Sequence, residues 1–230
     1  TISGSMLISS SPLSIFFGND IMIRSQPQRS GPARASARPR RLTPPLYAVP
    51  LHPRTPTGGR PSLRFSPIPR GVYPGFSALD PGALAARGIR LVLADLDNTL
   101  VPYRVAQPSP QLTAWRDALA AQGIALFILS NSRKPGRAQN FAQALGVPFQ
   151  GRSGKPRRRG YLQAMERMGC TPAQTVMVGD QIFTDTLGAN NAGVTPLLVE
   201  PIQLAGNPGR YLRYAAETPF RLLGKRRPFL

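Results

Sequence analysis

Short apolar segments alternate with helix-like segments between residues 79 and 199, and this alternation limits the fold more than any other feature of the chain. Five apolar segments have the length of buried strands, namely Ile89–Ala94, Ile124–Leu129, Val147–Gln150, Gln174–Val178 and Thr195–Val199. Helix signals occur in the segments around them, namely Leu79–Gly88, Ser109–Gly123, Lys134–Gly146, Arg157–Gly169 and Thr184–Gly193. Fully apolar strands that alternate with helices form parallel sheets with helices on both faces. The pattern therefore predicts an α/β fold of three layers, α/β/α, around a mostly parallel five-stranded sheet.

Polar residues that can carry out chemistry follow four of the five predicted strands. They are, in chain order, Asp95 and Asp97, then Ser130 and Asn131, then Lys155, and finally Asp180 and Asp185. The carboxyl ends of parallel strands lie at one edge of a sheet, where such folds place their sites. We therefore expect carboxylates, a hydroxyl and an ammonium to gather at this edge.

The acidic residues of this edge predict a magnesium site. Asp95 and Asp97 are two residues apart, so their side chains would point to one side of a continuing strand. Carboxylates this close repel each other, and the pKa of one of them rises unless a cation lies nearby. The chain has one histidine, His52, and one cysteine, Cys170, which excludes a zinc site of the Cys/His type. Mg²⁺ prefers oxygen ligands and leaves positions for phosphate, so it is the expected cofactor.

The same residues suit phosphoryl transfer. An ionised aspartate can attack phosphorus and form an acyl phosphate, and a second aspartate can protonate the leaving oxygen and then activate water. Ser130 can hydrogen-bond the phosphoryl oxygens, and Lys155 can neutralise their charge. Each residue alone also has an ordinary explanation, such as a helix cap for Ser130 or a solvated surface cation for Lys155. Their occurrence in order at successive strand ends favours the catalytic interpretation.

The four polar segments resemble the motifs of the haloacid dehalogenase (HAD) superfamily. DLDNT (95–99) is similar to its first motif, ILSNS (128–132) to its second, SGKP (153–156) to its third and GDQIFTD (179–185) to its fourth. The resemblance covers about residues 70–205 and implies a Rossmann-like phosphatase domain. It implies Asp95 as the nucleophile, Asp97 as the general acid and base, and three phosphate-binding residues, Ser130, Asn131 and Lys155. It also implies Mg²⁺ held by Asp95, the backbone carbonyl of Asp97, Asp180 and Asp185.

In finer detail the chain resembles the YqeG family of HAD subfamily IIIA, which includes phosphatidylglycerophosphatases of mitochondria and plastids. The resemblance rests on LADLDNTLVPY, SNSRKPGRAQNFAQALGVPF, GKP and VMVGDQIFTDTLGANNAGVTPLLVEP. It implies dephosphorylation of phosphatidylglycerophosphate or a similar lipid phosphate at a membrane surface. Only Leu100–Gln107 separates DLDNT from the next helix, which is too short for a large cap domain, so an open site is expected. Open sites of this superfamily are often covered by a neighbouring subunit, so an oligomer is compatible with the sequence.

The chain is strongly basic, with 29 Lys and Arg against 10 Asp and Glu and a net charge of +19. Such an excess favours an anionic partner, which can be a phospholipid surface, a phosphorylated substrate or nucleic acid. Residues 206–230 combine aromatic and aliphatic residues with cations, which suits an anionic membrane but equally suits a terminal helix packed on the sheet. Pro219 and Pro228 are expected to interrupt any long helix there.

Three functions remain open from the residues alone. The first is a lipid-phosphate phosphatase at a membrane surface, and the second is a HAD phosphatase for a soluble metabolite or a phosphoprotein. The third is an RNA- or ribosome-associated protein that binds through arginine clusters such as Arg152–Arg159. The intact set of Asp95, Asp97, Lys155 and Asp180 favours an enzyme, because a site that no longer catalyses a reaction has no reason to keep carboxylates that repel each other.

Residues 1–65 are rich in Pro, Arg and Ser and contain a single acid, Asp20, so they are predicted to be disordered. They are interpreted as a transit peptide, as a basic arm or as the product of a misassigned start, since the chain begins at Thr1. Residues 66–205 form the predicted phosphatase domain, and residues 206–230 form a basic, aromatic tail. No segment has the ~20 apolar residues that span a bilayer. We expect a cytoplasmic protein peripheral to the inner membrane face, or a mitochondrial or plastid one if a transit peptide is present.

Overall fold

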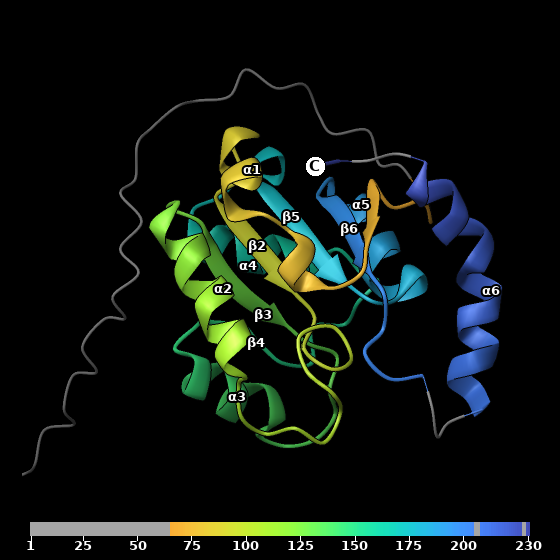
Figure 1. The fold of residues 1–230 in the computed structure, drawn as a ribbon, viewed down its shortest axis with the longest axis horizontal. Helices are drawn as coiled ribbons and strands as arrows, with labels where there is room; N and C mark the ends of the chain where they lie inside the picture. Colours follow the sequence, from red (N-terminus) through yellow and green to blue (C-terminus); the bar gives the residue numbers. More distant parts are fainter. Residues whose placement is uncertain (1–64, 205–207, 227–228) are drawn as a thin grey trace, which may run out of the picture. The chain divides into compact units, whose positions relative to one another are not determined.

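The computed structural model describes residues 65–204, 208–226 and 229–230, which form a parallel sheet with helices on both faces (Figure 1). Its six strands have the order β1-β6-β5-β2-β3-β4, and every neighbouring pair is parallel. The strands are β1 (Gly71–Tyr73), β2 (Leu91–Ala94), β3 (Ala125–Leu129), β4 (Phe149–Gln150), β5 (Thr175–Gly179) and β6 (Thr195–Val199). The α-helices are α1 (Pro81–Ala86), α2 (Pro110–Ala121), α3 (Arg137–Leu145), α4 (Arg159–Met168), α5 (Leu187–Ala192) and α6 (Pro208–Lys225). The predicted α/β/α architecture is confirmed.

Alternating side chains of the strands build two separate hydrophobic layers. On one face, residues such as Val92 and Ile128 pack with apolar residues of α1, α2 and α3. On the other face, residues such as Leu93 and Phe127 pack with apolar residues of α4 and α5. Because successive side chains of a strand point to opposite faces, a strand that is buried on both faces must be apolar throughout. This explains why the central strands appear in the sequence as continuous apolar runs.

Capping side chains fix the start of two helices as the sequence predicts. The carboxylate of Asp80 accepts a hydrogen bond of 2.7 Å from the amide of Ala83 at the start of α1. The hydroxyl of Ser109 accepts one of 3.2 Å from the amide of Leu112 at the start of α2. These bonds satisfy amides that have no partner within the helix.

The strand register brings the ends of the central strands to one level. In β2, Ala94 lies opposite Ile128 of β3 and Val178 of β5. The amide of Asp95 continues this pairing and donates a 2.9 Å hydrogen bond to the carbonyl of Val178. The residues that follow β2, β3 and β5 therefore leave the sheet side by side. Between β2 and α2 the chain forms a loop with one isolated bridge, Asp97 to Val101, and no inserted cap domain.

The prediction of five strands is wrong by one, because β1 forms a sixth strand beside β6. Three residues are too few to show a period in the sequence. Helix α3 begins at Arg137 rather than at Lys134, since Gly136 has a left-handed backbone with φ of 71°. The predicted helix from Thr184 to Gly193 consists of a π-helical turn, η3 (Ile182–Thr186), followed by α5.

Helix α6 runs through Pro219 for 18 residues, so the expectation that this proline interrupts the helix is wrong. A proline removes one hydrogen-bond donor from the helix, here the donor for the carbonyl of Ala215, and the burial of Glu217, Arg221 and Gly224 against the domain outweighs this loss. None of the helices in the described ranges is long and apolar enough to cross a membrane. The predicted disorder of residues 1–65 concerns residues that, except for Phe65, lie outside the described part of the chain.

Candidate active site

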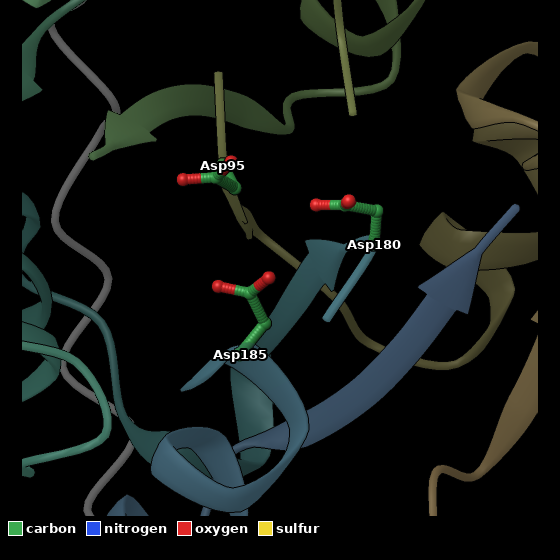
Figure 2. A group of neighbouring side chains, drawn as sticks. All are labelled: Asp95, Asp180 and Asp185. Carbon is green, nitrogen blue, oxygen red and sulfur yellow. The ribbon is translucent and has the colours of Figure 1, made fainter. Parts of the chain in front are cut away.

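Three aspartates meet at the carboxyl edge of the sheet. Asp95 follows β2, Asp180 follows β5, and Asp185 lies in η3. Each is buried, and one carboxylate oxygen from each lies within 4.8 Å of the other two. Figure 2 shows the three carboxylates turned toward a common space. The arrangement is that of a group that could hold a metal ion.

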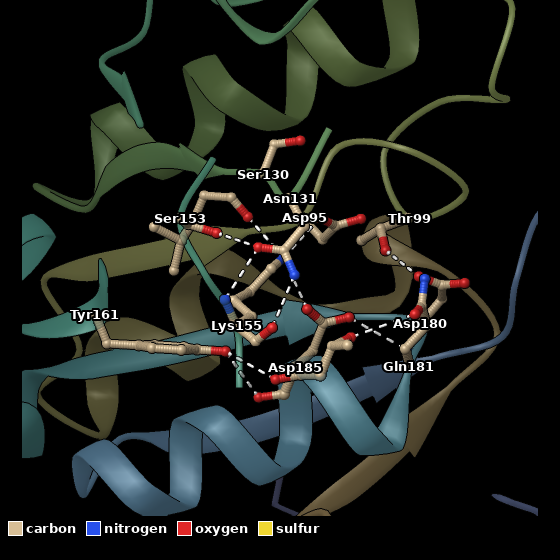
Figure 3. Close-up of polar contacts among 12 residues, drawn as sticks. Asp95, Thr99, Ser130, Asn131, Ser153, Lys155, Tyr161, Asp180, Gln181 and Asp185 are labelled. Atoms are coloured by element: carbon tan, nitrogen blue, oxygen red, sulfur yellow. Dashed lines mark hydrogen bonds and ion pairs between the residues drawn. The ribbon is translucent and has the colours of Figure 1, made fainter. Parts of the chain in front are cut away.

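Lys155 is the cation inside this acidic group. Its Nζ lies 2.6 Å from Oδ1 of Asp95 and 2.8 Å from Oδ1 of Asp185. Figure 3 shows Lys155 between Asp95 and Asp185. A third contact of 2.7 Å goes to the carbonyl of Leu129. The ammonium therefore contacts three oxygens and is itself buried. One positive charge faces three carboxylates, so the group is short of positive charge.

Burial and the neighbouring charges shift the pKa values of Asp180, Asp185 and Lys155. Burial raises the pKa of Asp180 to about 7, and the charges of Asp185 and Asp95 act in the same direction. Burial also raises the pKa of Asp185 to about 6, although the Lys155 ammonium opposes this shift. Burial alone would lower the pKa of Lys155, but the two carboxylates beside it raise it above its ordinary value.

The donor set of this group fits a hard divalent cation. All its ligand atoms are carboxylate oxygens, which are the ligands that Mg²⁺ prefers. Oδ1 of Asp185 is buried, and the Lys155 ammonium that pairs with it is shared with Asp95. Buried carboxylates that share one positive charge are incompletely compensated, which costs free energy. A cation that ligates Oδ1 would lower that cost.

The first motif contributes two further side chains that hold the group together. Thr99 donates a 3.1 Å hydrogen bond to Oδ1 of Asp180, and Asn98 donates one of 3.4 Å to Oδ2. Asn98 has a left-handed backbone with φ of 72° and lies in the loop that follows β2. Asp180 is therefore oriented by residues 81 and 82 positions away in sequence.

Asp97 lies outside the acidic group but faces the same cavity as Asp95. This cavity has a volume of about 350 Å³, and Ser130 also contributes to its lining. Oδ1 of Asp97 accepts hydrogen bonds of 3.1 and 2.9 Å from the guanidinium of Arg137. Burial raises the pKa of Asp97, and Arg137 counteracts the shift. The carboxylate is thus held in place beside the cavity without belonging to the group that could hold a metal.

The second motif divides into a cavity residue and a residue that holds a loop. Ser130 is buried at the cavity wall, where its Oγ accepts a 3.1 Å hydrogen bond from the amide of Ser132. Asn131 was expected to bind phosphate, but its amide group is engaged with the loop of the third motif. It accepts hydrogen bonds from Ser153 Oγ at 2.9 Å and the Lys155 amide at 3.0 Å, and it donates one to the Lys155 carbonyl at 2.9 Å. Asn131 therefore positions the segment that carries Lys155.

Helix α6 supplies two buried residues that sequence reasoning did not identify. Glu217 accepts hydrogen bonds from the amides of Ile182 at 2.9 Å and Phe183 at 3.4 Å. Arg221 donates to the carbonyl of Asp180 and pairs with Glu217 at 3.1 Å. The pair therefore supports the segment that carries Asp180 and Asp185. A signal was present, since Glu217 is the only acid in the last thirty residues of a basic chain.

Arg137 and Tyr161 were also missed. Arg137 holds Asp97, as described above, yet in the sequence it is one arginine among many. The Tyr161 hydroxyl donates to the carbonyl of Asp185 at 3.1 Å. Its ring packs so closely on Gly188 that a Cβ added there would lie 2.7 Å from the nearest ring atom. A tyrosine on an amphipathic helix gives no sign in the sequence of which carbonyl it will reach.

Comparison with known proteins identifies the family. Residues 152–201 match the model of the family described as HAD-hydrolase-like. The chain is 32% identical over 145 residues to the "Probable phosphatase YqeG" of Bacillus subtilis (strain 168), covering 63% of this chain and 83% of that protein. It is 30% identical over 159 residues to the chloroplastic phosphatidylglycerophosphate phosphatase 1 of Chlamydomonas reinhardtii, covering 66% of this chain and 58% of that protein.

Among solved structures, the cobalt-bound deoxy-D-mannose-octulosonate 8-phosphate phosphatase (YrbI) of Haemophilus influenzae is similar with a TM-score of 0.41 and 17% identity. The match covers 62% of this chain and 93% of that chain. The sequence matches, rather than this remote likeness, decide the assignment. The chain belongs to the HAD-like hydrolases, in the family of the YqeG phosphatase, and is a phosphoric monoester hydrolase.

Proposed function

We propose that this protein removes the terminal phosphate of a lipid phosphate, with phosphatidylglycerophosphate as the leading substrate, through a phosphoryl-aspartate on Asp95. The observation that carries the proposal is the meeting of Asp95, Lys155, Asp180 and Asp185 at the sheet edge. This group adjoins a cavity that Asp95, Asp97 and Ser130 line together. A nucleophile, an acid and phosphate-binding groups therefore have access to the same space.

In the first step, a carboxylate oxygen of Asp95 attacks phosphorus, and the bond from phosphorus to the leaving oxygen breaks. Asp97 gives its proton to that oxygen, which leaves as an alcohol. Lys155 neutralises charge on Asp95 and on the phosphoryl group, and the Ser130 hydroxyl donates a hydrogen bond to a phosphoryl oxygen. Burial favours the protonated form of Asp97, which suits the acid role.

In the second step, Asp97 accepts a proton from water, and the water oxygen attacks the phosphorus of the acyl phosphate. The bond from phosphorus to the Asp95 oxygen breaks, which releases inorganic phosphate and restores the carboxylate. Arg137 holds Asp97 through two hydrogen bonds to one oxygen. The other oxygen of Asp97 is thus available to carry the proton in both steps.

Mg²⁺ is the proposed cofactor, and Asp95, Asp180, Asp185 and the backbone carbonyl of Asp97 would hold it. When bound, it would neutralise negative charge on the phosphoryl oxygens and on the carboxylates. Asp180 is kept in place by Thr99 and by Arg221, which contacts its carbonyl. Asp185 is kept in place by the Gln181 amide, which donates a 3.2 Å hydrogen bond to Oδ2.

Gly179→Ala is expected to weaken metal binding by about 10- to 100-fold, a loss typical when the surroundings of metal ligands are disturbed. A Cβ at Gly179 would lie 2.4 Å from both Cγ and Oδ2 of Asp185, so the carboxylate must move. Titration of phosphate release with MgCl₂ measures the effect. Gly75→Ala is the matched control, because a Cβ there meets no atom within 4 Å. If the MgCl₂ concentration for half-maximal phosphate release were the same in Gly179→Ala and in the wild-type protein, Asp185 would not be a metal ligand.

The lipid substrate is supported by similarity to two proteins named phosphatidylglycerophosphate phosphatase 1, from Chlamydomonas reinhardtii and Arabidopsis thaliana. This chain spans 58% and 40% of their lengths. The absence of an inserted domain between β2 and α2 leaves the cavity accessible to a bulky molecule. Exposed cations at its wall, Arg133 and Lys134, suit an anionic headgroup.

A panel of phosphate esters tests this proposal. Purified protein with MgCl₂ is incubated with short-chain phosphatidylglycerophosphate, glycerol 3-phosphate, a phosphopeptide and p-nitrophenyl phosphate, and inorganic phosphate is measured. We expect the lipid to have the highest kcat/KM by at least about tenfold, which corresponds to about 1.4 kcal/mol of additional transition-state binding. A higher kcat/KM for a soluble ester would reject the lipid substrate and leave the phosphatase chemistry intact.

A further inference from the structure

A second cavity opens beside the reaction cavity and has a cationic lining. Its volume is about 710 Å³, and it is lined by Asn131, Arg133, Arg152, Gly154 and Lys155. Asn131 and Arg133 also line the reaction cavity, so the two cavities are neighbours with a shared wall. No acidic residue contributes to the lining of the second cavity. It is therefore a positively charged recess beside the proposed nucleophile.

Arg133 and Arg152 have guanidinium groups that are free to bind an anion. Both residues are exposed, and neither forms an ion pair or a side-chain hydrogen bond with another described residue. Arg137 and Arg221 differ, since both are engaged with carboxylates. An unpaired guanidinium offers a planar fork of donors that matches phosphate oxygens.

The backbone that carries Arg152 is held rigidly. The three hydrogen bonds of the Asn131 side chain bind the loop at Ser153 and Lys155. Arg152 has a left-handed backbone with φ of 50°, a conformation that costs energy for a residue with a Cβ. The backbone of Ser130 also holds the chain on both sides of Arg152, because its amide donates to the carbonyl of Gln150 at 3.0 Å and its carbonyl accepts from the amide of Ser153 at 3.0 Å. Arg152 therefore starts from a defined position at the wall of the recess rather than from a free surface loop.

We propose that this recess is a second anion subsite, which binds the phosphodiester of the substrate while the terminal phosphate occupies the reaction cavity. The inference rests on the proposed function. A phosphatidylglycerol phosphate carries two phosphate groups on one glycerol: a terminal monoester, which is cleaved, and a diester to the lipid. Arg133 lies in the wall between the two cavities, and Arg152 lies in the recess alone. The two arginines thereby select a substrate with a second anionic group over a simple monophosphate.

The test compares two substrates that share the glycerophosphate group. Dihexanoyl phosphatidylglycerophosphate carries the diester, and glycerol 3-phosphate lacks it. In the double variant Arg133→Ala/Arg152→Ala, the ratio of kcat/KM for the lipid to kcat/KM for glycerol 3-phosphate is expected to fall by at least about tenfold, the loss expected from removing charge-assisted hydrogen bonds. The loss should appear chiefly as a higher KM for the lipid. The wild-type full chain with MgCl₂ is the reference.

Arg157→Ala/Arg158→Ala is the matched control. It removes the same charge from exposed residues close in sequence that are not part of either cavity lining. The ratio should stay at the wild-type value in this variant. An equal fall of the ratio in both double variants would show that the effect comes from overall charge and would contradict the subsite. An unchanged ratio in Arg133→Ala/Arg152→Ala would also contradict it.

Two further outcomes separate the subsite from the proposed function. If the wild-type protein hydrolyses neither ester, the phosphatase proposal for these substrates fails and the subsite fails with it. If the wild-type protein hydrolyses both esters and kcat/KM falls equally for both in the double variant, only the subsite proposal fails. Inhibition of glycerol 3-phosphate hydrolysis by single-stranded RNA, lost in the double variant without any change in the lipid KM, would assign the recess to nucleic acid instead.

Discussion

Asp95→Asn is expected to reduce kcat for phosphate release by about 10⁴-fold or more, the scale of loss seen when a nucleophile is removed. An amide cannot form the phosphoryl intermediate, while its shape is almost that of the carboxylate. It keeps an oxygen for the Lys155 ammonium, which lies 2.6 Å from Asp95 in the wild-type protein. It also removes one of three mutually repelling carboxylates. The variant is therefore expected to fold without loss of stability in the absence of metal.

Phosphate release and thermal unfolding, measured on the same preparation, check this result. Asp117→Asn is the matched control, because Asp117 is an exposed acid of α2 that pairs with Arg116 and is not part of the cavity lining. A stable Asp95→Asn protein that retained a tenth of the wild-type kcat would exclude Asp95 as the nucleophile. A variant that failed to fold would contradict the electrostatic argument given for this group.

Lys155→Met is expected to destabilise the metal-free protein by about 3–5 kcal/mol, the typical cost of leaving buried charge without its partner. Methionine fills a similar volume but leaves Asp95 and Asp185 without the ammonium that contacts both. Burial and mutual repulsion already raise the pKa of Asp180 and Asp185. Removal of the ammonium would leave still more of this buried negative charge uncompensated. A divalent cation should compensate, so added MgCl₂ should stabilise the variant more than it stabilises the wild-type protein.

Urea unfolding with EDTA and with MgCl₂ measures both effects. Lys225→Met serves as the control, since Lys225 is exposed on α6 and its 3.5 Å pair with Glu200 is solvent-accessible, which limits its contribution to about 0–1 kcal/mol. Phosphate release by Lys155→Met should also fall by about 10²- to 10³-fold, as for the loss of a group that stabilises transition-state charge. Equal stabilities of Lys155→Met and the wild-type protein in EDTA would contradict the buried-pair interpretation.

The order of strands and helices and the position of the site follow from local patterns in the sequence. Continuous apolar runs indicated strands buried on both faces, and the sheet has these strands in its centre. Asp80 and Ser109 identified helix starts because capping depends on a side chain and an amide three residues away. Asp95, Lys155, Asp180 and Asp185 were expected at one edge, since parallel strands align their carboxyl ends there.

Other features had no local signal. Strand β1 has three residues, and only its pairing with β6 makes it a strand. The start of α3 depends on Gly136, whose left-handed conformation cannot be separated in sequence from a helical glycine. Helix α6 was expected to break at Pro219, yet packing of Glu217, Arg221 and Gly224 on the domain outweighs the loss of one backbone hydrogen bond.

By itself the sequence determined the fold class, the strand ends at which the polar residues gather and the excess of acids among them. These properties depend on periodicity and on neighbours a few residues apart. Only the tertiary structure decided which residues hold the acids in place: Arg137 for Asp97, Thr99 and Arg221 for Asp180, and Tyr161 for the backbone of Asp185. These contacts join residues far apart in the chain, and their geometry arises from the packing of helices on the sheet, which no local pattern encodes.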